Sequence, residues 1–81
     1  MAHFAKIEND KVTTVINIAN ADCGGGEFPE SEPIGQAFIA SLGLSGLWLQ
    51  TSYHNNFRNT YASIGYTYNK VLDQFELPEI E

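Results

Sequence analysis

The chain has 81 residues, which is enough for one small domain and too few for two. Ten acidic residues against four basic ones give a formal net charge of −6, and the basic residues are dispersed, so the stripe of positive charge that nucleic-acid binding needs is missing. A single cysteine excludes an internal disulfide, and no apolar run is long enough to span a membrane.

A domain of this size buries a modest share of its surface and usually needs further support. Cys23, His3 and His54 provide too few ligands for a structural zinc site. Association with other chains is then the remaining way to stabilise the fold. A content of 43% hydrophobic and 12% aromatic residues is compatible with such association. The opening residues lack the basic region and apolar core of a secretion signal, so we expect a soluble protein.

The first predicted element is a β-hairpin. Two runs with a strand pattern, Phe4–Ile7 and Val12–Ile18, flank Asn9-Asp10, and both turn residues tolerate a positive φ. Branched apolar residues lie on both faces of the second run, which predicts a strand that is covered on both sides.

Residues 20–31 are expected to form a flexible surface loop, because three consecutive glycines (Gly24–Gly26) and Pro29 interrupt any regular pattern. The Lys-Ser/Thr pair of a phosphate-binding loop is absent, and the nearby glutamates would repel an anion. Glu27, Glu30 and Glu32 do not have the spacing of a known calcium loop, so we expect no metal site here.

A helix is predicted over Glu32–Leu42, with Ser31 as its N-cap and Gly43 as its C-terminal stop. Apolar residues recur at helical spacing and predict a stripe that covers one face of the sheet; its members are Ile34, Ala37, Phe38 and Leu42, widened by Ile39. Gly35 is the weak point of the predicted helix, because glycine costs about 1 kcal/mol relative to alanine there.

Residues 47–75 form an aromatic unit that holds the tryptophan, all four tyrosines and the arginine. Strand patterns cover Leu47–Tyr53 and Tyr61–Tyr68, and a turn at Asn69-Lys70 leads to a return strand, Val71–Phe75. One helix can cover only one sheet face, so we expect the other face to leave an apolar patch for neighbouring chains.

Several motifs carry a family resemblance. The run W-x-Q-T-S-Y (48–53), the run F-R-x-x-Y-A-x-I-G-Y-T-Y (57–68), the D-x-F of 73–75 and the opening M-A-H-F-A-K-I resemble a small, uncharacterised, virion-associated protein family of tailed bacteriophages, particularly marine and cyanobacterial ones. The resemblance implies a non-enzymatic part of a virion that is assembled in the host cytoplasm.

No residues are spaced as a catalytic site. Cys23, His3 and His54 are the only candidates for a nucleophile and a base, and no motif surrounds them. We therefore expect no enzymatic activity, no cofactor and no small-molecule substrate.

These observations predict one α+β domain over residues 1–75, with a small antiparallel sheet and one helix packed on one face in the order ββ-α-βββ. Residues 76–81 are expected to form an extended acidic tail. The preferred function is capsid decoration or cement, and a tail, neck or fibre component is the nearest alternative. A small acidic regulatory or host-modulating binding protein is the alternative from another class.

The expected partners are other virion proteins, foremost the major capsid protein, and copies of the chain itself, without nucleic acid or membrane. Interface residues are predicted in the aromatic unit and the tail, because interfaces favour tyrosine and arginine and the tail offers apolar anchors. They are Tyr53, Phe57, Arg58, Tyr61, Tyr66, Tyr68, Leu77 and Ile80.

Overall fold

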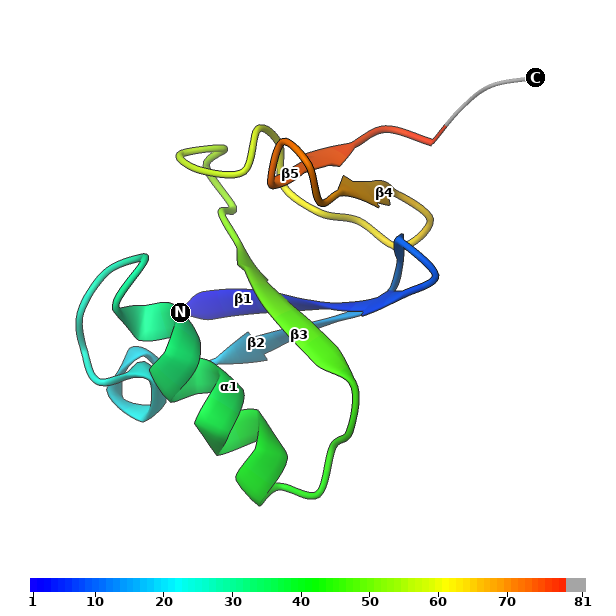
Figure 1. Ribbon diagram of the computed structural model, residues 1–81. Coiled ribbons are helices and arrows are strands. Elements are labelled where there is room, and N and C mark those ends of the chain that lie inside the picture. The colour runs from blue at the N-terminus through cyan, green and yellow to red at the C-terminus, as the bar shows by residue number, and fades with distance from the viewer. Residues whose placement is uncertain (79–81) are drawn as a thin grey trace.

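The computed structural model describes residues 1–78 and shows a small α+β fold with a curled, five-stranded antiparallel sheet and one α-helix, which confirms the predicted class. In chain order the elements are β1 (Ala2–Glu8), β2 (Lys11–Ile18), the 3-10 helix η1 (Asn20–Cys23), α1 (Ser31–Ser41), β3 (Leu47–Thr51), β4 (Thr67–Asn69) and β5 (Gln74–Glu76). The strands lie in the order β3-β1-β2-β4-β5, with α1 and the β4–β5 hairpin at different ends of the molecule (Figure 1).

The β1–β2 hairpin forms where the sequence predicts it. Asn9 and Asp10 adopt φ angles of 52° and 61°, which two-residue hairpin turns require. The register shifts between Lys6 and Ile7, so that one extra residue of β2 bulges and the sheet curls at this point.

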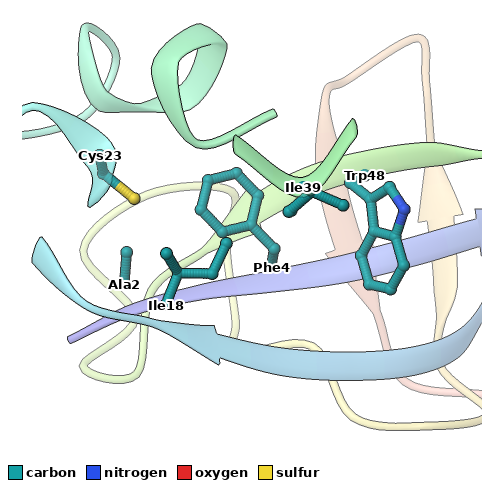
Figure 2. Close-up of a cluster of buried hydrophobic side chains, with 6 residues drawn as sticks. All are labelled: Ala2, Phe4, Ile18, Cys23, Ile39 and Trp48. Atoms are coloured by element: carbon teal, nitrogen blue, oxygen red, sulfur yellow. The ribbon is translucent and has the colours of Figure 1, made fainter. Parts of the chain in front are cut away.

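Two apolar clusters fill the two faces of the sheet. The first lies under α1 and η1, with Phe4 at its centre (Figure 2), and consists of Ala2, Phe4, Ile18, Cys23, Ile39 and Trp48. The second lies on the opposite face and consists of Ala5, Ile7, Val12, Leu49, Ala62 and Phe75. The prediction of a large uncovered apolar face is therefore wrong, because residues 61–76 fold back over the face that the helix leaves open.

The predicted apolar stripe of the helix is correct only in part, since Phe38 and Ile39 pack on the first cluster and the other members do not. Ile34 and Leu42 of the predicted stripe are 46% and 57% exposed, whereas Gly35 and Ile39 are buried against the sheet. Ser31 is not an N-cap, because its hydroxyl donates to Oε1 of Gln50 at 2.7 Å. Apolar side chains project from most sides of this short helix, so the apolar pattern alone does not select its inward side. Close packing at the small residues selects it.

Only the end of the predicted strand 61–68 is extended. β4 begins at Thr67, and the return strand begins at Gln74. In the turn between them, Oδ1 of Asn69 accepts hydrogen bonds from the backbone N–H groups of Val71 and Leu72. Phe75 therefore pairs with Tyr68, and the first three residues of the predicted return strand, 71–73, lie in the turn instead.

Gly35 is the closest point between α1 and the sheet. A Cβ atom added there would lie 2.7 Å from Cε1 of Phe4, whose ring is fully buried, and 3.1 Å from Sγ of Cys23. The residue that lowers helix propensity is thus the one that lets the helix reach the first cluster.

We expect Gly35→Ala to lower the free energy of unfolding, because overpacking costs about 1–3 kcal/mol and outweighs a propensity gain of about 1 kcal/mol. Urea unfolding measures the change. Gly26→Ala is the matched control, since nothing lies within 4 Å of the added Cβ. A Gly35→Ala protein more stable than the natural one would show that the helix contact is loose.

Candidate functional site

Four ring side chains meet at the end of the sheet where β1 begins and β3 ends. His3 stacks on Tyr53 with a centroid distance of 5.5 Å and meets Tyr61 edge-on at 5.5 Å. Tyr53 also contacts His54 at 5.3 Å and Tyr61 at 5.4 Å. We call His3, Tyr53, His54 and Tyr61 the aromatic surface, because Tyr53 is 64% exposed at its centre.

A shallow pocket of about 260 Å³ opens beside the aromatic surface. Its lining comes from the chain start and the residues after β3: Met1, Ala2, His3, Gln50, Thr51, Ser52, Tyr53, His54 and Phe57. Nδ1 of His3 is buried and has no hydrogen-bond partner among the described residues. The exposed ring and hydroxyl of Tyr53 suit contact with a partly polar surface.

Arg58 lies next to this surface and links segments that are far apart in the sequence. Its guanidinium forms a two-pronged ion pair with Glu32 at the start of α1, and its Nε donates to Asp73 at 2.9 Å. Nη1 also donates to the carbonyl of Gln50 at 2.9 Å, and the N–H of Gln50 donates to Glu32 at 2.8 Å. We call these four residues the Arg58 network.

The electrostatics of the Arg58 network follow from burial and pairing. The arginine side chain is 8% exposed; burial lowers its pKa, but the hydrogen bonds and charges of Glu32 and Asp73 outweigh burial and raise the pKa overall. The hydrogen bond from Tyr68 and the pairing with Arg58 lower the pKa of Asp73 despite its desolvation. Desolvation and the bond to Asp73 raise the pKa of Tyr68 to about 12.

A second aromatic pair lies beside the guanidinium of Arg58. Phe28 and Phe57 stack with their centroids 3.9 Å apart and their planes 8° apart, and the guanidinium carbon of Arg58 is 5.1 Å from the centroid of Phe28. Arg58 itself adopts a φ of 56°, which is uncommon for a residue with a Cβ atom and shows how tightly its partners hold it.

The structure divides the predicted interface residues into groups. Tyr53 and Leu77 are exposed, at 64% and 67%, and Tyr61 contacts Tyr53. The partly buried residues Tyr66 and Tyr68 pack against the second cluster. Phe57 and Arg58 are held by partners of their own chain, as described above, and Ile80 lies outside the described residues.

Sequence reasoning missed His3 and Phe28 as members of the site, as well as Glu32 and Asp73 as partners of Arg58. No local pattern identifies them, because Glu32 lies 26 residues and Asp73 15 residues from Arg58. The single arginine in an acidic chain was the one available signal.

The thiol of Cys23 lies in the first cluster, 1% exposed, and burial raises its pKa. Within residues 1–78, no group of three His, Cys, Asp or Glu side chains is placed to hold a metal ion. None of the helices in that range has the length and apolar character of a membrane span. Comparisons with protein-family models, with curated proteins and with solved structures find no match to this chain.

Proposed function

We propose that the protein is a non-enzymatic structural component of a tailed-phage virion and that it contacts other virion proteins through the aromatic surface. One observation carries the proposal: Tyr53 is 64% exposed although three other rings lie around it. Partly exposed, mutually supported rings suit a surface that becomes dry on association, because tyrosine combines a large apolar ring with a polar end.

The preferred place in the particle is the capsid, where a small protein in many copies decorates or cements the major capsid protein; a tail, neck or fibre position is the second candidate. The motifs at 48–53 and 57–68 support the virion assignment, and the small size of the domain supports a need for partners. The proposal retains the order ββ-α-βββ with the helix on one face, which the packing of Phe4 beneath Gly35 supports.

Within this proposal the predicted interface residues have two roles. Tyr53, Tyr61 and Leu77 contact the partner. Arg58 does not contact the partner, because its polar atoms are already bonded within the chain. It holds the loop that carries Phe57 in place.

Mass spectrometry of purified virions tests the assignment. We expect the protein to be present in a fixed ratio to the major capsid protein, with a ratio near one per capsomer position for a cement protein and a much lower ratio for a tail or neck component. Absence from purified virions, with abundance in the infected cell, would contradict the proposal and favour a regulatory binding protein.

The aromatic surface is tested by binding the purified protein to particles that lack it. Tyr53→Ala is expected to weaken binding about tenfold or more, as for the anchor residues of other interfaces. Val71→Ala is the matched control, because Val71 is 88% exposed and lies at the β4–β5 turn, outside the aromatic surface. Equal binding by both variants would remove Tyr53 from the interface.

A further inference from the structure

β3 and β2 flank β1 in the three-stranded part of the sheet. They differ in whether the backbone groups on the side away from β1 are hydrogen-bonded. On β3, the outward carbonyl of Trp48 accepts a hydrogen bond from Gln36 at 2.6 Å. The outward N–H of Gln50 donates to Glu32, and its outward carbonyl accepts a hydrogen bond from Arg58. Side chains of the helix and of the following loop thus close the β3 edge against a further strand.

The direction of these groups fixes the direction of all others in the sheet, because residues of antiparallel strands alternate in which side they bond to. The backbone N–H and C=O of Gln50 point away from β1, so those of its neighbours Leu49 and Thr51 hydrogen-bond to their partners on β1. These partners, Ala5 and His3, therefore face β3.

The backbone groups of Phe4, between them, point toward β2, where the paired residue is Ile16. The same alternation leaves Val15 and Asn17 with their N–H and C=O groups directed away from β1. β4 pairs with this side of β2 only at Lys11, and Gly65 and Tyr66, just before β4, hydrogen-bond to Val12. Among the described residues, no backbone or side-chain hydrogen bond covers the edge from Thr13 to Ile18, which we call the free β2 edge.

The free β2 edge also lacks the devices that normally block edge pairing. From Val12 to Ala21 the chain has no charged residue and no proline, and residues 12–18 are mostly β-branched. The nearest charged residues, Asp10 and Lys11 before the edge and Asp22 after it, lie outside the free β2 edge and do not interrupt it.

We propose that the free β2 edge pairs with the same edge of a second copy of this chain, antiparallel and about a two-fold axis at Ile16. Val15 of each copy then lies opposite Asn17 of the other, and each such pair exchanges two backbone hydrogen bonds. The half-buried Ile16 side chains meet at the axis and extend the first cluster.

The symmetry of the edge favours a second copy as the occupant. In this register each copy presents the same outward backbone groups, those of Val15 and Asn17, to the other copy, so the edge is complementary to itself and satisfies a two-fold interface. This inference deepens the proposed function, since a virion part present in many copies repeats its own contacts.

Hydrogen exchange of the purified protein tests the pairing residue by residue. We expect the amides of Val15 and Asn17 to become protected as protein concentration rises, in step with dimer formation seen by analytical ultracentrifugation. The amide of Ile16, which is bonded to β1, should be protected at every concentration.

Asn17→Pro removes an outward donor without breaking a β1–β2 bond, so we expect a folded monomer; Asn17→Ala keeps the donor and should dimerise like the natural protein. If Asn17→Pro fails to fold, the exchange measurement decides. A natural protein that stays monomeric with unprotected Val15 and Asn17 amides, or an Asn17→Pro protein that still dimerises, would overturn the proposal.

Protection that develops only when another virion protein is added would also overturn it, and would assign the edge to that protein. These results are independent of the virion test, because a monomer in solution can still be abundant in particles and a dimer can be absent from them.

Discussion

Replacing Trp48 with alanine is expected to destabilise the domain by about 3–5 kcal/mol, the usual cost of removing a large buried aromatic side chain. The indole is 6% exposed, and it packs in the first cluster with Phe4 and Ile39 (Figure 2). Its N–H donates to the carbonyl of Ser45 at 3.1 Å, so the change also removes a hydrogen bond that shapes the loop before β3. Small domains have a stability of about 5 kcal/mol at the lower end, so most of the margin is lost.

Urea unfolding followed by circular dichroism measures this loss, since the change removes the tryptophan fluorescence. Leu47→Ala is the matched control: the neighbouring side chain on the same strand is 50% exposed and should cost much less. If the two variants unfold at the same urea concentration, Trp48 does not hold the first cluster together.

Arg58→Met is expected to cost about 3 kcal/mol, toward the lower end of the range for breaking a buried ion pair from one side. The change leaves Glu32, whose side chain is 16% exposed, as a nearly buried carboxylate without its cation. It also removes the donor to the carbonyl of Gln50, so the β3 edge loses one of its covering bonds.

A double change separates the two causes. If the unpaired carboxylate is the main cost, Glu32→Gln combined with Arg58→Met is more stable than Arg58→Met alone. Asp73→Asn is the control for the exposed arm of the network, because the Asp73 side chain is 55% exposed and pairs of that kind contribute less than about 1 kcal/mol. A loss below about 1 kcal/mol for Arg58→Met would place Arg58 with ordinary surface ion pairs.

Local signals in the sequence predict part of this fold well. The β1–β2 hairpin depends on two turn residues and on alternation over a few positions, and the burial of Trp48 follows from apolar residues on both faces of its strand. Gly43, with a φ of 83°, ends the helix region as its residue type predicts. In each case, interactions between near neighbours decide the conformation.

Other features depend on contacts between distant segments and were beyond sequence reasoning. The facing side of α1 is set by the fit of Gly35 over Phe4, which no helical period indicates. Residues 61–66 have strand-like composition, yet they form no strand; Ala62 packs in the second cluster and its N–H donates to the Thr51 hydroxyl. For the candidate site, Tyr53, Tyr61 and Arg58 were singled out from the sequence, but the other residues that contact them were not.

The Arg58 network also constrains the order in which this chain can fold. The β1–β2 hairpin needs only the first 18 residues and can form early during synthesis. Arg58 joins Glu32, which precedes it by 26 residues, to Asp73, which follows it by 15. Because Phe75 of the last strand belongs to the second cluster and Asp73 to the Arg58 network, we expect both to close only after residues 73–76 have been synthesised.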